Sequence, residues 1–161
     1  MSDTATGIST TVKPLDPALD AEAAAILARC PALGSPERAV EAVKTARADE
    51  DDSLFGLMID GRLAGAYILR KVHLFNEIEL LAVAAEHERS GHGKMCLYDA
   101  LLRSGRRPLV VEADESNLGF FKKCGFKLVG KRKGTDGSPR YRLGWHAPIP
   151  KPGGAPGEVV C

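Results

Sequence analysis

The chain changes from an apolar, strand-like run to an amphipathic, helix-like run across Val83-Ala84-Ala85-Glu86-His87-Glu88-Arg89-Ser90-Gly91-His92-Gly93-Lys94. The turn between the two runs is rich in glycine, so it points several backbone N–H groups at one place. The positive end of the helix dipole adds to these donors. The stretch therefore predicts a cradle for an anion such as a phosphate or a pyrophosphate.

Composition bounds the class of protein. The chain has 161 residues, 44% hydrophobic and 27% charged, with a formal net charge of +1. This length suits one domain, and the small net charge gives no basic field for a nucleic-acid partner. The apolar runs are shorter than the roughly 20 residues that span a bilayer, so we expect no membrane segment. The N-terminus lacks the basic and apolar regions of a secretory signal.

The cysteines and histidines show no metal-binding pattern. The four cysteines, Cys30, Cys96, Cys124 and Cys161, are widely spaced and form no Cys-x-x-Cys pair. We therefore expect free thiols in a reducing cytoplasm and no bound metal.

Hydrophobic periodicity and turn signals predict a mixed order of strands and helices. Strands are expected at 8–14, 53–59, 62–72, 75–84, 108–113, 126–131 and 139–145, and helices at 17–29, 35–48, 93–104 and 117–123. Asp60-Gly61 marks a hairpin, and the strand–helix–strand unit between 72 and 108 implies one parallel pair. We expect a single-domain α/β (mixed α+β) fold over residues 8–146, with helices on both faces of a twisted, mostly antiparallel sheet. Residues 1–7 and 147–161 are expected to be disordered.

Two segments of this sequence resemble the GNAT acetyltransferases. Gly91-His92-Gly93-Lys94 is similar to the end of that family's pyrophosphate loop, and Asn117-Leu118-Gly119-Phe120-Phe121-Lys122-Lys123-Cys124-Gly125-Phe126 is similar to its second conserved block. The resemblance covers about residues 53–132. It implies a GNAT-like sheet with a central splayed parallel pair. It also implies an N-acetyltransferase that moves an acetyl group from acetyl-CoA to a primary amine of a small molecule or protein, by direct attack in a ternary complex.

The resemblance also implies roles for individual residues. Backbone groups of Leu81, Ala82 and Val83 would pair with the pantetheine arm, and an N–H near Val83 would polarise the thioester carbonyl. The remaining acetyl-CoA contacts are implied at Glu88, Arg89, Ser90, Gly91, His92, Gly93, Lys94, Asn117, Phe120 and Phe121.

The acceptor amine needs a base, and two carboxylates precede the expected cleft. Glu77 and Glu79 stand two apart on one strand and so share a face. The resemblance implies Glu77 as the first candidate, because some members of the family keep a catalytic Glu there, and Glu79 as the second. The alternative is a solvated strand face. The acidic run Asp49 to Asp52 either draws a cationic amine toward the cleft or is only a solvated loop.

The chain departs from the family pattern at two positions. Glu88 stands where an Arg or Gln is usual, which leaves Arg89 as the nearby positive charge. Phe121 stands where many members have a Tyr that protonates the departing thiolate. Because a thiol has a pKa near ~8.5, losing the acid slows the reaction by roughly 10²–10⁴ rather than forbidding it. Tyr98 and Tyr141 are the alternative donors.

These departures support a second hypothesis, an acyl-CoA-binding regulatory module with weak or no turnover.

Two further expectations concern single residues. Asn117 is expected to cap the helix that follows it, and Trp145 with the last strands is expected to form a homodimer contact, as the family's habits suggest.

Overall fold

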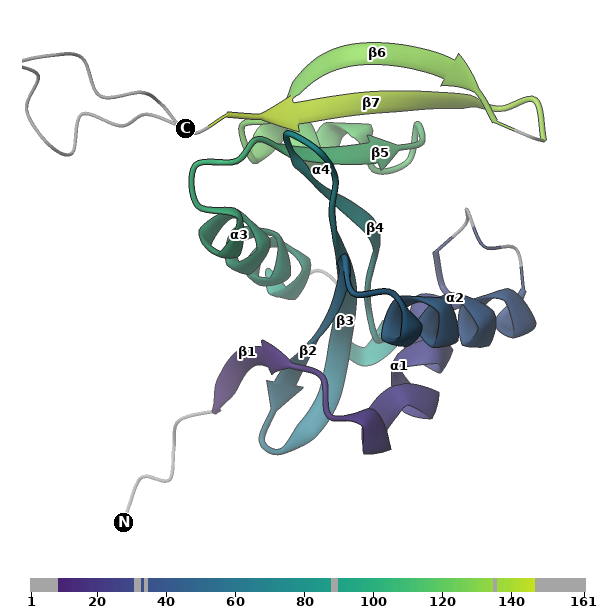
Figure 1. Cartoon of the computed structure of the whole chain (residues 1–161), viewed down its shortest axis with the longest axis vertical. Coiled ribbons are helices and arrows are strands. Elements are labelled where there is room, and N and C mark those ends of the chain that lie inside the picture. The colour runs from purple at the N-terminus through teal and green to yellow at the C-terminus, as the bar shows by residue number, and fades with distance from the viewer. Residues whose placement is uncertain (1–8, 31–32, 34, 88–89, 135, 147–161) are drawn as a thin grey trace, which may run out of the picture.

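The structure is a computed structural model that describes residues 9–30, 33, 35–87, 90–134 and 136–146 (Figure 1). The ends expected to be disordered, 1–7 and 147–161, lie outside the described residues. The strands are β1 Thr10–Pro14, β2 Asp52–Ile59, β3 Arg62–Lys71, β4 Asn76–Val83, β5 Leu109–Ala113, β6 Lys127–Lys133 and β7 Pro139–Trp145. The helices are η1 Pro17–Leu19, α1 Asp20–Leu27, α2 Pro36–Ala48, η2 Ala85–His87, α3 His92–Ser104 and α4 Leu118–Lys123.

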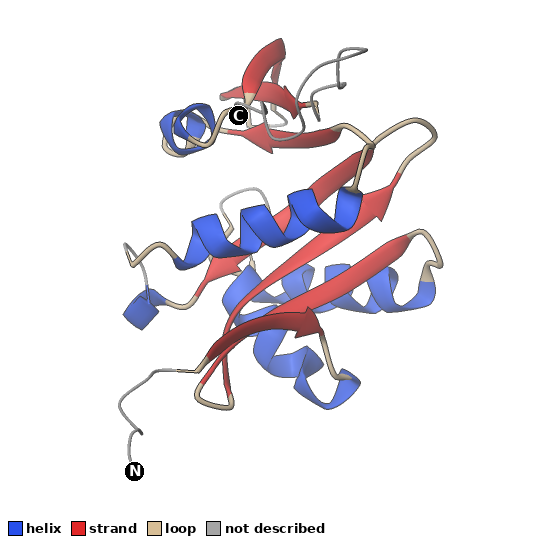
Figure 2. Cartoon of the chain, turned by 90° about the vertical axis from the view of Figure 1, so that its left-hand side faces the viewer, coloured by secondary structure: helices blue, strands red, loops and turns tan. Residues whose placement is uncertain are grey.

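All seven strands form one twisted sheet in the order β1-β2-β3-β4-β5-β7-β6 (Figure 2). Neighbouring strands run antiparallel except β4 and β5, which are parallel. Helix α3 connects these two strands, as the strand–helix–strand unit predicted. The predicted fold class, a mixed sheet with one parallel pair at its centre, is confirmed.

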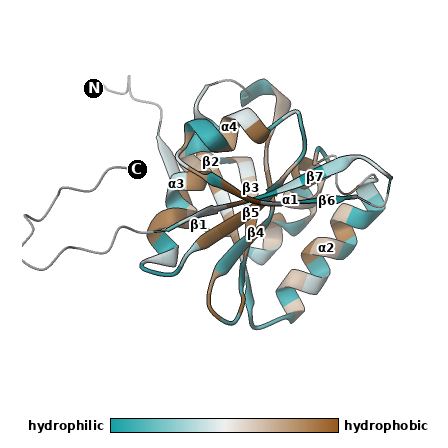
Figure 3. Cartoon of the chain, turned by 90° about the horizontal axis from the view of Figure 1, so that it is seen from above, coloured by the Kyte–Doolittle hydropathy of each residue, from teal (hydrophilic) through white to brown (hydrophobic). Residues whose placement is uncertain are grey.

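Helices cover both faces of the sheet. Figure 1 shows α1 and α2 on one side of β3 and β4, with α3 on the other. The core under α1 and α2 includes Leu27 and Ile68, and the core under α3 and α4 includes Leu57 and Leu97. Apolar colour accordingly gathers on the central strands in Figure 3. Burying both faces explains why β2 and β3 read as nearly continuous apolar runs rather than alternating ones.

Local signals define several of these boundaries. Asp60 and Gly61 have φ of 50° and 80°, the positive values that a two-residue hairpin between β2 and β3 requires. The Ser35 hydroxyl accepts a hydrogen bond from the Arg38 amide and so caps α2. Gly125 follows α4 with a φ of 96°, so it ends the helix as predicted.

Three details differ from the sequence prediction. The helix expected at 17–29 is split, because the Asp16 carboxylate caps a separate turn, η1, before α1 begins. The helix expected at 93–104 begins one residue earlier, at His92, and it buries Cys96, Leu97 and Ala100, whereas the large side chains of Met95, Tyr98 and Leu102 are exposed. The third difference is at Asp52, which begins β2 rather than ending a solvated loop.

Candidate active site

A cleft opens at the centre of the sheet, where β4 and β5 separate. Asn76, Glu77 and Ile78 pair with Leu109, Val110 and Val111, and the pairing described between the two strands ends there. The cleft beyond has a volume of about 300 Å³. Its lining residues are Arg29, Cys30, Ile78, Glu79, Leu80, Leu81, Ala82, Val83, Val111, Glu112, Asp114, Asn117, Phe120, Phe121 and Arg140.

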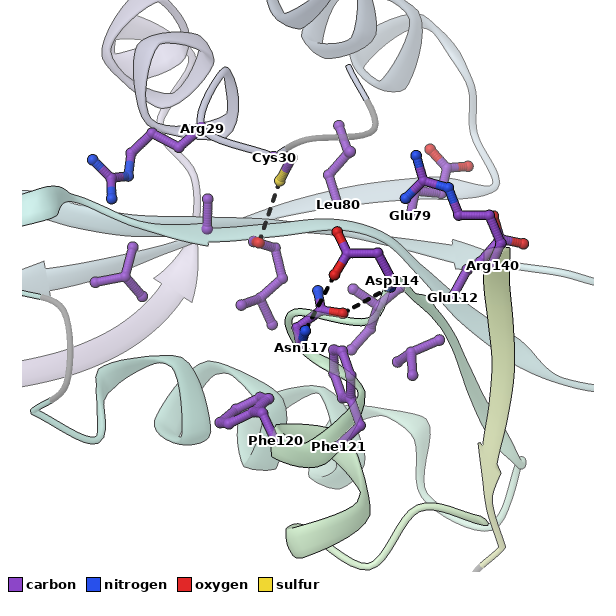
Figure 4. Close-up of a pocket in the computed structure, with 15 residues that line it drawn as sticks. Arg29, Cys30, Glu79, Leu80, Glu112, Asp114, Asn117, Phe120, Phe121 and Arg140 are labelled. Carbon is purple, nitrogen blue, oxygen red and sulfur yellow. Dashed lines mark hydrogen bonds between the residues drawn. The ribbon is translucent and has the colours of Figure 1, made fainter. Parts of the chain in front are cut away.

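The cleft joins the two faces of the sheet (Figure 4). Asn117, Phe120 and Phe121 lie on the side of α3 and α4, whereas Arg29 and Cys30 lie on the side of α1. Glu79, Glu112 and Arg140 gather at one end. A molecule bound on one face can therefore meet a second molecule bound from the other.

A β-bulge at Glu79 re-aims the residues of β4. Pairing with β3 passes from Leu69↔Ile78 to Ile68↔Leu80, so Glu79 is left without a partner in the ladder. Ile78 and Leu81 consequently pack in the same core, under α3 and α4, although they are an odd number of residues apart. The bulge thus sets which side chains of β4 face each half of the cleft.

The backbone of β4 is available for hydrogen bonding beyond the bulge. The Ala84 N–H donates to Ala64 O of β3 at 2.8 Å. Because successive N–H groups along a strand point in opposite directions, the N–H groups of Val83 and Leu81 point away from β3 and toward the cleft. Leu81 O points the same way and accepts from the Cys30 thiol at 3.3 Å. This edge can pair with an extended ligand, and the Val83 N–H can polarise a carbonyl.

The turn before α3 has backbone geometry that suits an anion. Gly91 precedes the helix with a φ of 80°, and the N–H groups of the first turn have no partners within the helix. A Cβ on Gly93 would meet Phe120 and Val83 only at 3.8 and 3.9 Å, so packing does not require glycine there. The absent side chain leaves the helix start open toward the cleft, which fits the close approach of a pyrophosphate.

The side chains of this loop are arranged as follows. His92 Nδ1 donates to His87 O at 3.1 Å, and the Lys94 ammonium lies 5.4 Å from the centre of the Tyr98 ring. Ser90 lies exposed in the turn. Glu88 and Arg89 lie outside the described residues, so the predictions for them stay predictions.

The loop before α4 is held by its own polar side chains. Asn117 Oδ1 accepts from the Asp114 amide at 2.8 Å, and the Asp114 carboxylate accepts from the amides of Ser116 and Asn117. Asn117 stands at the N-cap position, but its side chain does not cap α4. The expected capping role is therefore wrong, because the Asn117 amide group turns back onto the loop and lines the cleft.

The two candidate bases differ in position. Glu79 lines the cleft, and its Oε1 accepts from Arg70 at 3.1 Å. The Glu77 carboxylate lies 3.5 Å from Arg142 and is not among the cleft-lining residues described. Burial raises the pKa of Glu77, and the charge of Arg142 opposes that rise.

Comparison with known proteins agrees with this geometry. The sequence profile of the acetyltransferase (GNAT) family matches residues 21–126, more than half of the chain. The chain belongs to the GNAT acetyltransferase family. Members of this family use acetyl-CoA as co-substrate. No curated protein matches the chain in sequence.

Solved GNAT structures share the fold at low sequence identity. A GNAT acetyltransferase from Elizabethkingia anophelis with acetyl-CoA bound aligns with a TM-score of 0.68 and 18% identity, over 85% of this chain and 97% of that one. An aminoglycoside 6'-N-acetyltransferase complexed with coenzyme A aligns with a TM-score of 0.74 and 13% identity, over 88% of this chain and 99% of that one. The ribosomal-protein-S18-alanine N-acetyltransferase from Escherichia coli aligns with a TM-score of 0.68 and 22% identity, over 86% of this chain and 94% of that one.

The tyrosines of this GNAT protein do not take the place of Phe121. The chain has three tyrosines, Tyr67, Tyr98 and Tyr141. The Tyr67 hydroxyl is buried and donates to Asp99, Tyr141 donates to Glu115, and Tyr98 lies in a separate groove between α3 and β1. None of them lines the cleft in the described part of the chain. Phe121 itself is 6% exposed and packs edge-on against Phe126.

Sequence reasoning missed several residues of the cleft. Arg29 and Cys30 enter it from the end of α1, and Glu112 and Arg140 enter it from β5 and β7. These positions carry no motif, and only the pairing of distant strands and helices brings them together. Within the described residues, no cluster of three acidic, cysteine or histidine side chains is arranged to hold a metal, and no helix has the length and apolar character to cross a membrane.

Proposed function

We propose that the protein is an N-acetyltransferase that transfers the acetyl group of acetyl-CoA to a primary amine of a small molecule or protein, by direct attack in a ternary complex. The cleft through the sheet carries this proposal. It runs along the edge of β4 to the carboxylates at one end, and two of its lining residues, Val83 and Phe120, lie next to Gly93 in the first turn of α3. Such a passage lets a thioester and an amine meet from opposite faces.

The backbone supplies binding and carbonyl polarisation. The first-turn N–H groups of α3 would hold the pyrophosphate, and the edge of β4 at Leu81 would pair with the pantetheine arm. The Val83 N–H would then lie where charge develops on the thioester oxygen. These donors belong to the main chain, so Glu88 in place of the family's Arg or Gln leaves them unchanged.

The proton of the amine would pass to Glu79, directly or through water. Glu79 is placed ahead of Glu77 here because only Glu79 of the two lines the described cleft. The amine nitrogen forms a bond to the carbonyl carbon, the carbon–sulfur bond breaks, and the electron pair leaves on the sulfur of CoA. A thiol pKa near ~8.5 lets the thiolate depart unaided, at a reduced rate.

The second candidate is an acyl-CoA-binding regulatory module with little turnover. The apolar Phe121 in the cleft favours it, because no tyrosine hydroxyl of the described chain lies there to assist the leaving group. We also propose a cytoplasmic location, which the free thiols Cys30, Cys96 and Cys124 support. The homodimer through Trp145 remains a prediction. It is supported by the exposure of Leu128 and Val129, which stand on the edge strand of the same hairpin.

The experiment incubates the protein with acetyl-CoA and a panel of amines and detects products by mass spectrometry. The panel spans aminoglycosides, polyamines and peptides with free N-termini or lysines. We expect one amine class to be acetylated, and Glu79→Gln to lower the rate by about 10²–10⁴. Glu41→Gln, on the exposed face of α2, is the matched control and should keep full activity. Acetyl-CoA that binds but is recovered intact with every amine would favour the regulatory module.

A further inference from the structure

Asp52 carries a carboxyl group that is almost completely removed from solvent. It is the first residue of β2, and its side chain is 1% exposed. Oδ2 lies 3.6 Å from Arg70 Nη1, whereas Oδ1 is buried and has no hydrogen-bond partner in the described structure. A buried carboxylate oxygen without a hydrogen-bond partner destabilises the folded state, so the protonation state of Asp52 needs a physical explanation.

The same guanidinium also holds the candidate base. Arg70 Nη1 donates to Glu79 Oε1 at 3.1 Å, and Arg70 Nη2 lies 3.5 Å from Asp49 Oδ2. Two features of the sheet produce this cluster. Asp52 and Arg70 are register partners in the β2–β3 ladder, and the bulge in β4 brings Glu79 to the same guanidinium.

The charges around this cluster do not balance. Asp49 from the end of α2, Asp52 from β2 and Glu79 from β4 all pair with the one guanidinium of Arg70 from β3. Arg140 of β7 lies at the same end of the cleft, but among the ion pairs described it has none with these three carboxylates. The neighbouring carboxylates have cations of their own: Glu77 is paired with Arg142 of β7, and Glu112 of β5 is paired with Arg132 of β6. One proton held between two of the three carboxylates would reduce the excess negative charge.

Asp52 is the carboxyl best placed to hold that proton. Burial raises the pKa of Asp52 to about 6, and the adjacent negative charge of Glu79 acts in the same direction, whereas Arg70 opposes both. A protonated Asp52 becomes a donor and can give its hydrogen to Glu79, which also provides the missing partner for its buried oxygen.

We propose that Asp52 is a positioning residue that shares one proton with Glu79 and holds the Glu79 carboxylate against Arg70, facing the cleft. The proposal rests on the function above, in which Glu79 takes the proton of the amine. That proton leaves the nitrogen as the nitrogen–carbon bond forms, and it joins the Glu79 oxygen while Asp52 keeps the shared proton. Asp52 touches no substrate and acts through Glu79.

The test has a titration arm and a kinetic arm. In the titration arm, side-chain carboxyl carbons of ¹³C-labelled protein are followed by NMR from pH 3 to 9 without substrate. We expect Asp52 to titrate near pH 6, and we expect the signal of the Glu79 carboxyl carbon to move at that same step because the two carboxyls share the proton. Asp52→Asn should abolish that step, whereas Asp51→Asn, at the exposed neighbouring position, should leave it unchanged.

In the kinetic arm, kcat/KM is measured against pH on the acetylated amine. Asp52→Asn keeps a donor toward Glu79, so we expect activity within about tenfold of wild type and loss of the inflection near pH 6. Asp52→Leu keeps no donor, and it should lower kcat by a further tenfold or more with little change in KM for acetyl-CoA. A kcat that is largely kept in Asp52→Asn and lost in Asp52→Leu would not be expected if Asp52 only filled space.

The two arms separate this inference from the proposed function. An Asp52 step that leaves the Glu79 carbon signal unmoved, or an Asp52→Asn profile identical to wild type, would overturn the inference. An Asp52 step near pH 6 that the Glu79 carbon reports, in a protein that acetylates no amine, would support the shared proton and contradict the proposed function alone.

Discussion

The stability of the protein should depend on pH through Asp52, and Asp52→Asn isolates that dependence. The pKa of this carboxyl rises from its ordinary 3.8 to about 6 in the folded protein. The native state therefore holds a proton between pH 4 and 6 that the unfolded chain has released. It follows that the free energy of unfolding falls as pH rises through this window.

The size of the effect follows from the difference in pKa. One pKa unit corresponds to about 1.36 kcal/mol, so the rise to about 6 corresponds to at most about 3 kcal/mol. The side chain is 1% exposed, so solvent screens this energy little. Because Glu79 shares the proton, the measured change should be at or below this figure. An asparagine has no proton to release and should show no such change.

The assay is equilibrium unfolding in urea at pH 4, 5, 6 and 7. The stability of Asp52→Asn relative to wild type should rise by about 2–3 kcal/mol across this range. Asp51→Asn should track wild type at every pH. The difference between the free energies of unfolding of wild type and Asp52→Asn cancels the contribution of carboxylates that are the same in both proteins. A stability difference that stays constant from pH 4 to 7 would show that Asp52 has the same pKa in the folded and unfolded states, and it would refute the reasoning.

Three further substitutions test the cleft and its support. Gly93→Ala lies inside the first turn of α3, where the new Cβ would make ordinary van der Waals contacts with Phe120 and Val83, so we expect a gain of about 0.5–1 kcal/mol in the free energy of unfolding together with weaker acetyl-CoA binding by calorimetry; unchanged affinity would contradict the cradle. Tyr67→Phe removes the hydrogen bond to Asp99 and should cost about 1–2 kcal/mol in urea unfolding, an effect that a fully solvated hydroxyl would not show. Phe121→Tyr restores a hydroxyl beside the cleft and should raise kcat by about tenfold or more in the acetylation assay; an unchanged kcat would mean that departure of the thiolate does not limit the reaction.

The sequence alone determined those features that depend on neighbouring residues. Asp60 and Gly61 adopt the positive φ of a two-residue hairpin turn, which few other residues tolerate. The pair therefore made the hairpin between β2 and β3 predictable. The glycine-rich turn at Gly91 likewise predicted the start of α3, and the anion cradle at that start stays a prediction. These short-range signals, together with the periodicity of the strands, were enough to predict the order of elements and to indicate the GNAT family.

The tertiary structure decided where the carboxylates lie. Glu77 and Glu79 looked equivalent in sequence, but the bulge in β4 and the separation of β5 bring Glu79 to the cleft. Asp52 read as part of a solvated acidic loop, whereas its pairing opposite Arg70 buries its side chain. Strand register and bulges depend on contacts between residues far apart in the chain. Local residue patterns therefore predict which elements form, but not which polar groups these elements bury together.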